Sequence, residues 1–455
     1  MSEMGQRAEM AAEAVVGGAS RKIARRLIPF LILCYFVAYL DRVNVGFAAL
    51  TMNKELGFNA EIFGFGAGIF FFGYFIFEVP SNILLERFGA RMWIARIMIS
   101  WGIVSACMAF VSGATSFYVV RFILGIAEAG FFPGIILYLT YWFTARERAR
   151  WIGVFMAAIP LSSVIGGPVS GMILDHMGGA LGLKGWQWLF VIEGLPSIIV
   201  GLVTLAFLDD KPAAASWLAP DERAAVTARL EAERSNREAI KSYSLAGALT
   251  NPRVLALSLV YFGLVSGNYG LGFFLPTIVK GVAQTLGLDA ATGIGINTLT
   301  GYLVAVPYAC AIVGMIWWTR RSDRAEERVM HVAAPAIIGG LALVAAAYLA
   351  NPILAALALT ICAVATYAAL PTFWALPTAF LTGTAAAGGI ALVNSIGHLG
   401  GYVGPDVMGR LTKAYGAPTY GLVFLAACYV MAGVVTLVLG HDREMEMAGA
   451  TQPTA

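Results

Sequence analysis

The chain has 455 residues, of which 59% are hydrophobic and only 13% are charged, with a formal net charge of +3 at pH 7. Soluble domains carry about 25% charged residues, so this composition excludes an ordinary soluble protein. Apolar stretches of about 20 residues, the length that crosses a bilayer core ~30 Å thick, recur along the whole chain. The sequence therefore indicates a polytopic membrane protein.

Twelve apolar segments are candidate membrane-spanning helices. They are 27–50, 60–84, 92–112, 115–140, 151–174, 187–208, 253–279, 292–318, 331–350, 352–378, 386–409 and 418–440. The first 20 residues contain four charged residues and no apolar core, so we do not expect a cleavable secretory signal. The five cysteines lie inside apolar runs without the spacing of metal ligands, which predicts buried free thiols at Cys34, Cys107, Cys310, Cys362 and Cys428.

A single long polar stretch, 209–250, separates the sixth and seventh spans. Its core, "WLAPDERAAVTARLEAERSNREAIKS", alternates charges at helical spacing and places Pro220 at a plausible first-turn position. This pattern predicts a solvated linker that carries a surface helix. We therefore expect an N-terminal six-helix bundle at 1–208, the linker at 209–250 and a C-terminal six-helix bundle at 251–455.

Positive charge marks the cytoplasmic side of a membrane protein. Here it precedes the first span and follows the second, fourth and eighth, at Arg21, Lys22, Arg25, Arg26, Arg87, Arg91, Arg146, Arg148, Arg150, Arg320, Arg321, Arg324 and Arg328. The exceptions on the other side are Lys54, Lys184, Lys280, Arg410 and Lys413. We expect a multi-pass protein of the cell inner membrane with both termini and the linker in the cytoplasm.

The two halves of the chain repeat certain features. Charged loops, "NILLERFGAR" and "WTRRSDRAEER", follow the second and eighth spans, and the fifth and eleventh spans contain "GGPVSG" and "VGPDVMG". Two six-helix halves joined by a linker suit alternating access, with a substrate site between the halves near the middle of the membrane.

Several motifs resemble the major facilitator superfamily, and more narrowly its anion:cation symporter family of tartrate, phthalate and sugar-acid transporters. They are "LDRVN", "GYFIFEVPSNILLERFGAR", "RFILGIAEAGFFPG", "YWFTARERARWIG" and "GGPVSG". The resemblance spans about residues 21–440 and implies an all-α fold of two pseudo-symmetric six-helix bundles, with a monomeric protein. Its gating loop would contain Glu86, Arg87, Gly89 and Arg91, although Asn82 stands where the motif usually has glycine and Glu86 where it has aspartate.

Charged residues inside the spans are few. Asp41 and Arg42 lie in the first span and Arg121 and Glu128 in the fourth, whereas two further carboxylates, Glu78 and Glu193, are expected nearer span ends. Each charge costs about 2.5–3.5 kcal/mol at the bilayer centre, so the four central ones cost on the order of 10 kcal/mol unless they are paired or hydrated. They could be packing salt bridges that fix helix register, but we favour a functional role.

Helical geometry predicts which of these groups share a face. Arg121 and Glu128 are seven residues apart and share one face, with Gly125 between them leaving room for another group or a ligand. Tyr39 and Arg42 share a face of the first span, whereas Asp41 points about 100° away from Arg42. We therefore expect the first span to line a water-accessible cavity and to present its acid and its base to different neighbours.

The chemistry of these side chains suggests their roles. Arginine presents a charged planar fork that binds a carboxylate in bidentate fashion, so Arg42, ranked first, and Arg121 are candidate anion-binding residues. Arg121 has the alternative role of partner to Glu128. A carboxyl group in a low-dielectric cavity can load and release a proton near neutral pH, so Asp41 and Glu128 are candidate proton carriers. The resemblance implies the same division, with Tyr39 and Tyr74 helping to bind substrate.

The second half offers neutral polar residues at helical spacing: Tyr367, Pro371, Trp374 and Thr378 in the tenth span, and Asn394, His398 and Gly401 in the eleventh. Asn268 and Tyr269, flanked by glycines in the seventh span, could form an unwound patch. Each residue alone is more often explained by helix packing. Together they suggest the neutral wall of a substrate pocket, in which His398 makes hydrogen bonds rather than relaying protons.

Other motifs argue against enzymatic function. "GFGAG", at 64–68, lies within a predicted span and indicates close helix packing rather than a dinucleotide loop. No P-loop, HExxH or GxSxG sequence occurs, which argues against an ATP-driven pump or an intramembrane hydrolase. We expect no cofactor, no metal and no nucleic-acid partner.

These observations favour a secondary symporter that moves a small organic carboxylate inward with protons. Two alternatives are an anion exchanger or facilitator without proton coupling, and a membrane sensor that binds a ligand in the same pocket. Tartrate-like hydroxy acids would suit the polar second half. An aromatic acid would suit Trp374, Tyr74 and the phenylalanines at 70–72.

Overall fold

The computed structural model describes residues 3–238, 251–325, 327–380 and 383–440. These residues form helices and short connections, and no strand occurs among them. The first half contains α1 (Glu3–Leu56), α2 (Ala60–Phe88), α3 (Ala90–Cys107), α4 (Ala114–Glu128), α5 (Phe131–Thr140), α6 (Ala145–Met156), α7 (Ala158–His176) and α8 (Gly185–Phe207). The second contains α11 (Pro252–Thr285), α12 (Leu288–Thr292), α13 (Ile296–Ala325), α14 (Val329–Tyr348), α15 (Pro352–Phe373), α16 (Ala375–Phe380), α17 (Gly383–Tyr415) and α18 (Thr419–Leu439).

Eleven segments of the described chain are helical, long and apolar enough to cross a membrane. They match eleven of the predicted spans, and α17 occupies the remaining predicted segment, 386–409. The all-α, twelve-helix fold is therefore confirmed. The predicted fourth, fifth and tenth spans each contain a break, where α4 gives way to α5, α6 to α7 and α15 to α16.

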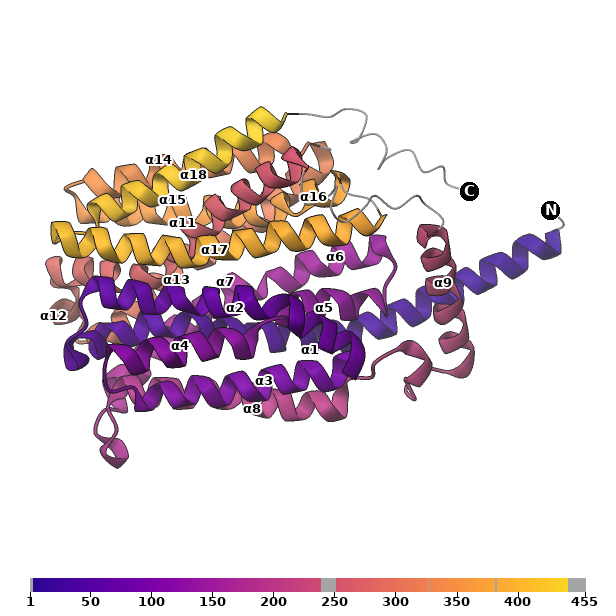
Figure 1. Ribbon diagram of the computed structural model, residues 1–455, viewed down its shortest axis with the longest axis horizontal. Helices are drawn as coiled ribbons and strands as arrows, with labels where there is room; N and C mark the ends of the chain where they lie inside the picture. The colour runs from indigo at the N-terminus through magenta and orange to yellow at the C-terminus, as the bar shows by residue number, and fades with distance from the viewer. Residues whose placement is uncertain (1–2, 239–250, 326, 381–382, 441–455) are drawn as a thin grey trace.

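The helices lie side by side in two bundles (Figure 1). Within the first bundle α3 packs on α8, α2 on α4, and α1 on α7 and α8; within the second α11 packs on α17 and α18, and α15 on α13 and α14. The two bundles meet mainly where α2 contacts α17 and α7 contacts α13. We call the end of the molecule that carries α9 (Pro220–Glu238) the linker end, and the opposite end, where α1 ends and α2 begins, the distal end (Figure 1).

Glycines let the two bundles approach closely. A Cβ atom on Gly64 or Gly68 of α2 would overlap a backbone carbonyl of α17, and one on Gly167 or Gly171 of α7 would overlap a backbone carbonyl of α13. The prediction that "GFGAG" serves helix packing is thereby confirmed. Near the distal end, Asp175 of α7 also accepts hydrogen bonds of 2.7 Å from the side-chain amide of Asn297 and the backbone NH and hydroxyl of Thr298.

Cations at the distal end, which depart from the charge pattern of the loops, join elements of the structure. Lys413 of α17 pairs with Glu61 of α2 at 2.5 Å. Lys280 of α11 donates to the Leu50 carbonyl of α1 at 3.2 Å. Both contacts tie the two bundles together, which gives these cations a structural reason to lie where positive charge is otherwise sparse.

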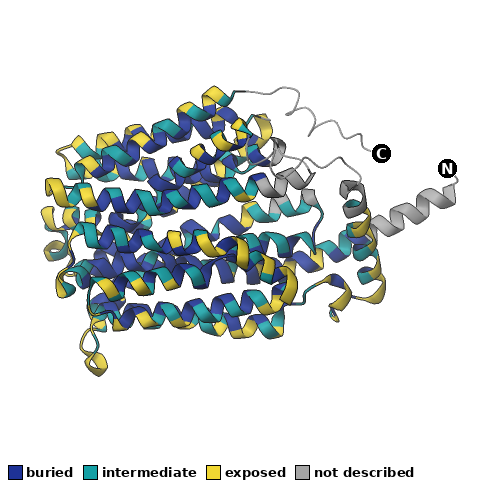
Figure 2. Ribbon diagram, viewed as in Figure 1, coloured by how far each residue is buried: buried dark blue, intermediate teal, exposed yellow. Residues whose placement is uncertain are grey.

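Buried residues lie along the inner faces of the helices, and apolar residues are also exposed on the outer faces (Figure 2). The prediction of five buried thiols is wrong for Cys107 and Cys310, which are exposed. Cys310 lies on the same face of α13 as the exposed Val306 and Val313. In a membrane protein both the core face and the outer face of a helix are apolar, so an apolar run does not show which face a cysteine occupies.

The linker helix α9 begins at Pro220, as predicted, but it is docked against the bundle rather than simply solvated. Lys22 of α1 pairs with Glu222 of α9 at 2.5 Å, and Val226 of α9 is buried. Just before α9, Trp217 donates to Asp209 at 2.8 Å. The linker residues 239–250 lie outside the described part of the chain.

Candidate substrate-binding site

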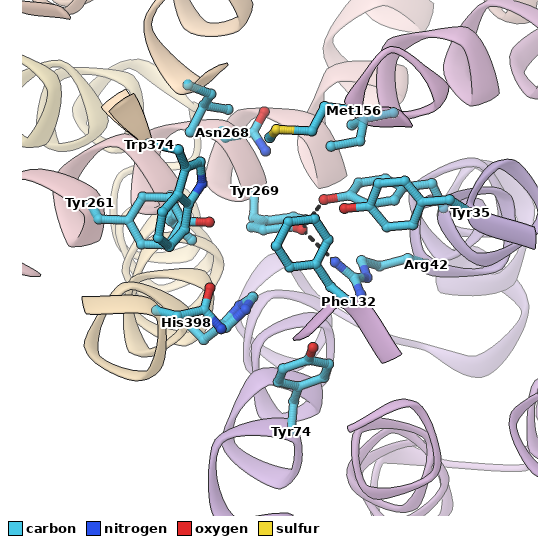
Figure 3. A pocket seen from close by; sticks show the side chains of 15 residues that line it. Tyr35, Arg42, Tyr74, Phe132, Met156, Tyr261, Asn268, Tyr269, Trp374 and His398 are labelled. Carbon is cyan, nitrogen blue, oxygen red and sulfur yellow. Dashed lines mark hydrogen bonds between the residues drawn. The ribbon is translucent and has the colours of Figure 1, made fainter. Parts of the chain in front are cut away.

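A pocket lies between the two bundles, and the empty space in and in front of it is about 510 Å³ (Figure 3). The first bundle contributes Tyr35, Tyr39, Arg42, Tyr74, Phe132, Met156 and Ile159, and the second contributes Tyr261, Val265, Asn268, Tyr269, Leu370, Trp374, Asn394 and His398.

Arg42 brings the positive charge to this pocket. Its Nη1 atom donates a hydrogen bond of 2.7 Å to the hydroxyl of Tyr269, and its Nη2 atom forms an ion pair with Glu128. The guanidinium lies over the ring of Tyr39, 4.6 Å from its centroid, and the hydroxyls of Tyr39 and Tyr269 are hydrogen-bonded at 2.7 Å. Residues of both bundles therefore hold the guanidinium (Figure 3).

The position of Glu128 depends on a break in the helix. Glu128 is the last residue of α4, and α5 begins at Phe131 after a turn in which Gly130 has φ of 84°. A glycine is favoured at this φ because other residues rarely adopt it. Glu128 is only 1% exposed, so its ion pair with Arg42 is shielded from solvent and is stronger than a surface pair would be.

Several buried polar atoms of the pocket have no hydrogen-bond partner among the described residues. They are Arg42 Nε, Tyr74 Oη, Asn394 Oδ1 and His398 Nδ1. Buried polar groups in folded proteins are normally paired, and unpaired ones are costly. Two polar atoms from each bundle are thus available to hydrogen-bond a polar ligand.

Five predicted residues of the second half line the pocket: Asn268, Tyr269, Trp374, Asn394 and His398. Thr378 falls in α16, but its side chain lies outside the described part. The predicted unwound patch at Asn268 and Tyr269 is wrong, because α11 is continuous through both residues.

The glycines beside that pair have another purpose. A Cβ atom on Gly267 would overlap the ring of Tyr429, and one on Gly270 would overlap Leu425. These glycines therefore allow α11 to pack closely on α18 and do not unwind the helix.

Aromatic contacts join α2 to the second bundle at this level. The rings of Tyr74 and His398 lie 4.6 Å apart, and those of Phe71 and Tyr269 lie 4.4 Å apart. Below them, Glu78 accepts hydrogen bonds from Asn394 and Ser395 of α17. Glu78 was expected near a span end, but α2 continues to Phe88, so the residue is buried between the two bundles.

Three predicted charged residues are not among the side chains that line the pocket: Arg121, Glu128 and Asp41. Arg121 donates to the backbone carbonyls of Gly66 and Ala67 at 3.2 and 2.9 Å, and its guanidinium faces the ring of Phe70 at 4.9 Å. Glu128 pairs with Arg42 rather than with Arg121. The space beside Gly125 is filled by the backbone of α2, so that glycine serves helix packing and not ligand access.

Asp41 lies inside the first bundle. It accepts hydrogen bonds from Trp101 Nε1 at 2.7 Å, from Ser105 Oγ at 2.9 Å and from Ser197 Oγ. Arg42 instead faces the pocket. The prediction that α1 presents its acid and its base to different neighbours is therefore confirmed.

Sequence reasoning missed some residues of the pocket, among them Tyr35, Phe132, Met156 and Tyr261. Tyr35, Tyr39 and Arg42 follow one another at helical spacing, and so do Tyr261, Val265 and Asn268. Extending the first stripe by one turn and the second by two turns would have found both tyrosines. Phe132 and Met156 carry no such signal.

The predicted gating loop joins α2 to α3. Gly89 has φ of 88°, and a Cβ atom there would lie 2.9 Å from a carboxylate oxygen of Asp210. The same carboxylate accepts the backbone NH of Arg91 at 2.9 Å. The loop is thus held by the chain that follows α8.

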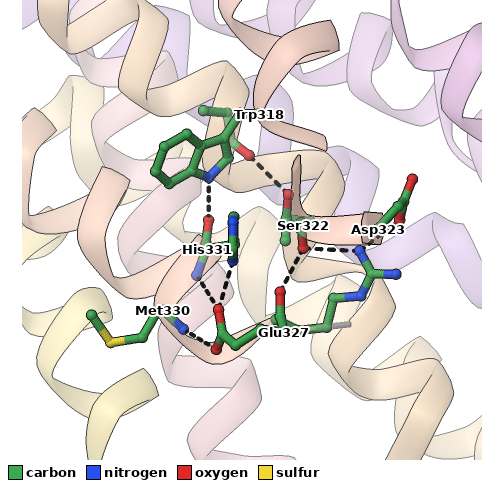
Figure 4. A network of polar contacts seen from close by, with 9 residues as sticks. Trp318, Ser322, Asp323, Glu327, Met330 and His331 are labelled. Carbon is green, nitrogen blue, oxygen red and sulfur yellow. Dashed lines mark hydrogen bonds and ion pairs between the residues drawn. The ribbon is translucent and has the colours of Figure 1, made fainter. Parts of the chain in front are cut away.

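The corresponding loop between α13 and α14 has its own polar network (Figure 4). Glu327 accepts the backbone NH groups of Met330 and His331 at 2.6 and 3.2 Å, which caps the start of α14. Ser322 donates to the Glu327 carbonyl at 2.7 Å. The two halves therefore repeat the position of this loop but fix it by different contacts.

Two helical bundles with a pocket between them fit the architecture of membrane transporters. A family model described as Major Facilitator Superfamily matches residues 31–405. A protein of Agrobacterium vitis named "Putative tartrate transporter" is 50% identical over 422 residues, covering 93% of this chain and 91% of that protein. The inner membrane transport protein RhmT of Escherichia coli K12 is 36% identical, covering 94% and 97%.

Among solved structures, the xylose transporter XylE from E. coli, in a partially occluded inward open conformation, matches with a TM-score of 0.73. The match covers 93% of this chain and 99% of that one, at 14% identity. The chain belongs to the Major Facilitator Superfamily, and the predicted resemblance to its anion-transporting branch is confirmed. Its relatives and its fold are those of transporters rather than enzymes.

Proposed function

We propose that this protein imports a small organic carboxylate together with protons by alternating access. The observation that carries the proposal is the buried ion pair between Glu128 and Arg42, of which Arg42 lines the pocket between the two bundles. The arginine can bind an anion, and the glutamate competes with that anion for the same guanidinium.

This competition can couple the proton to the substrate. While Glu128 is ionised, it holds Arg42 and neutralises its charge. When Glu128 takes up a proton, the guanidinium is freed to bind a substrate carboxylate in bidentate fashion. The Tyr269 hydroxyl accepts a hydrogen bond from the guanidinium, and the Tyr39 hydroxyl is hydrogen-bonded to that of Tyr269. The two tyrosines would keep the guanidinium in place. Proton and anion therefore enter the binding site together.

The opposite wall would recognise the rest of the substrate. Asn394 and His398 offer unpaired polar atoms, and Asn268 and Trp374 lie nearby in the same pocket. Hydroxyl groups of a tartrate-like acid suit these side chains, and the name of the Agrobacterium vitis relative supports that class. Because aromatic rings also line the pocket, aromatic acids are the alternative substrate class.

The arrangement of the protein in the membrane follows the charge pattern. Lys22 and Arg26 of α1 lie at the linker end with α9, so this end and both termini are assigned to the cytoplasm of a monomer in the inner membrane. The two bundles are assigned to 1–208 and 251–455. The contacts of Asp175, Lys280 and Lys413 then close the outer side of the pocket.

Transport by purified protein in proteoliposomes tests the proposal. Labelled tartrate is offered first in counterflow at equal pH, then under an inward proton gradient with the membrane potential clamped by potassium and valinomycin. A symporter accumulates tartrate under the gradient, and a protonophore abolishes that accumulation. An exchanger shows counterflow alone, and a sensor binds the ligand without either activity. Competition by phthalate, hydroxyphenylacetate and sugar acids then identifies the substrate class.

A further inference from the structure

A second group of buried carboxylates lies within the first bundle, outside the pocket. It contains Asp41 of α1 and Glu193 of α8, which are 2% and 1% exposed. Asp41 and Ser197 are hydrogen-bonded, and Glu193 lies one helical turn before Ser197. The two acids therefore occupy neighbouring levels of the same interface between α1 and α8.

The two acids have different surroundings. Asp41 accepts three hydrogen bonds, one from an indole NH and two from serine hydroxyls. Glu193 accepts one, from the Ser170 hydroxyl to its Oε1 atom at 2.6 Å. Its Oε2 atom has no partner among the described residues. Three donors stabilise an ionised carboxylate, so the surroundings of Asp41 favour a negative charge more than those of Glu193 do.

The second observation concerns the buried side chain of Asn44. It lies three residues after Asp41 on α1, is 1% exposed, and neither its Oδ1 nor its Nδ2 atom has a hydrogen-bond partner in the described part of the chain. Asn44 is within hydrogen-bonding range of Glu193, and Asp41 acts on Glu193 through its charge. A buried amide and a buried carboxyl thus lie beside each other, each with polar atoms that form no hydrogen bond of normal geometry with a described residue.

No basic group of the described chain neutralises this pair of acids. On α1, the guanidinium of Arg42 is directed to Glu128 and Tyr269. Just before α8, Lys184 is nine residues from Glu193, or about 13 Å along the helix axis, and it pairs with Glu55.

The other helices packed on α8 are α3, α7 and a short 3-10 helix at Met108–Phe110, which carries no charged side chain. On α3, Arg96 lies two residues before Met98. Met98 contacts Thr204 of α8, which is eleven residues, or about 16 Å, from Glu193 along that helix. On α7, Asp175 and His176 lie five and six residues beyond Ser170, and the Asp175 carboxylate is bonded to α13. Nothing that faces Glu193 from these helices carries a positive charge.

We propose that Glu193 and Asn44 form a proton-binding site separate from the substrate pocket, with the proton on Glu193 Oε2 donated to Asn44 Oδ1. One proton pairs both unpaired oxygens and removes one of two neighbouring negative charges from the membrane interior. A sodium ion would need a larger set of oxygen ligands than Glu193, Asn44 and Ser170 provide. Asp41, a proton carrier in the sequence-based hypothesis, stays ionised in this arrangement.

Infrared spectroscopy of the full-length protein in lipid tests the site, because a protonated carboxyl and a carboxylate absorb at different frequencies. At neutral pH we expect a protonated-carboxyl band that is lost in Glu193→Gln and retained in Asp41→Asn. Glutamine can still donate to Asn44, so this variant should keep the fold. In the unsubstituted protein, ¹³C-labelled aspartate should leave the band unmoved and ¹³C-labelled glutamate should shift it.

Three results would overturn the proposal. The first is a band unaffected by Glu193→Gln, and the second is a band that moves with labelled aspartate. The third is a band present in choline chloride but lost in sodium chloride, which would make this a sodium site.

The physiological role of this proton rests on the proposed proton coupling, but the spectroscopic test does not. Gradient-driven uptake without the band would refute the Glu193 site alone. The band without gradient-driven uptake would refute symport alone. With both present, Glu193→Gln should lower the proton-to-substrate ratio, measured from reversal potentials, by one if this proton moves in each cycle.

Discussion

Replacing Arg42 with lysine tests the anion-binding group directly. In the structure one guanidinium makes two separate contacts, to Tyr269 and to Glu128, while stacking on the ring of Tyr39. A lysine ammonium keeps the charge but is a single point donor that cannot reproduce this fork. We expect substrate affinity to fall more than tenfold, which corresponds to about 1.4 kcal/mol of binding free energy.

Titration of the detergent-solubilised protein with substrate measures this loss, by calorimetry or by the fluorescence of Trp374 in the pocket wall. Arg96→Lys is the matched control, since Arg96 stacks on Trp93 at 4.0 Å outside the pocket. Its affinity should equal that of the unsubstituted protein. If Arg42→Lys binds substrate as tightly as this control, Arg42 does not bind the anion.

Three further substitutions have defined outcomes. Glu128→Gln imitates the protonated carboxyl, so counterflow should persist while accumulation driven by a pH gradient disappears. Accumulation equal to that of the unsubstituted protein would mean that the Arg42–Glu128 pair is only a packing contact. Asp175→Asn disturbs three hydrogen bonds to α13 and should destabilise the closed distal end by about 1–3 kcal/mol. The expected signs are a lower melting temperature in detergent and faster cross-linking of cysteines placed inside the distal interface. Hydrogen bonding to Lys22 lowers the pKa of Glu222, so this carboxylate supports docking of α9 above its ordinary pKa and that support is lost as pH falls through the lowered value. Limited proteolysis of the linker should therefore accelerate in acid, and Glu222→Gln should abolish the pH dependence.

The sequence was sufficient for the spans and for one face of the pocket. Helical spacing placed Tyr39 and Arg42 together and turned Asp41 away from them, because intrahelical geometry is fixed. It could not identify partners on other helices. Glu128 shares a face of α4 with Arg121 yet pairs with Arg42, since the break after α4 and the close approach of α2 decide which cation it meets.

Interior carboxylates were harder to judge from sequence. Glu78 was placed near a span end because an apolar run does not define where a helix stops, and α2 continues to Phe88. The sixth span was predicted almost to the residue, but its sequence could not show that Glu193 is buried against Ser170 of α7. Glycines were similarly ambiguous. At Gly267 the same residue type permits unwinding or tight packing, and the ring of Tyr429 on another helix decides between them. Such choices depend on tertiary contacts that a single sequence does not display.

The glycine contacts between α2 and α17 are a point about which α2 can tilt. Gly64, where α2 touches the α17 backbone, and Tyr74, in the pocket, are ten residues apart on one continuous helix. That separation is about 15 Å, so a tilt of roughly 10° about the glycine contact would displace Tyr74 by about 2.6 Å. A movement of this size equals the length of a hydrogen bond. A small tilt of α2 at the distal end is therefore enough to make or break a hydrogen bond between Tyr74 and a bound substrate, without any change within the helix itself.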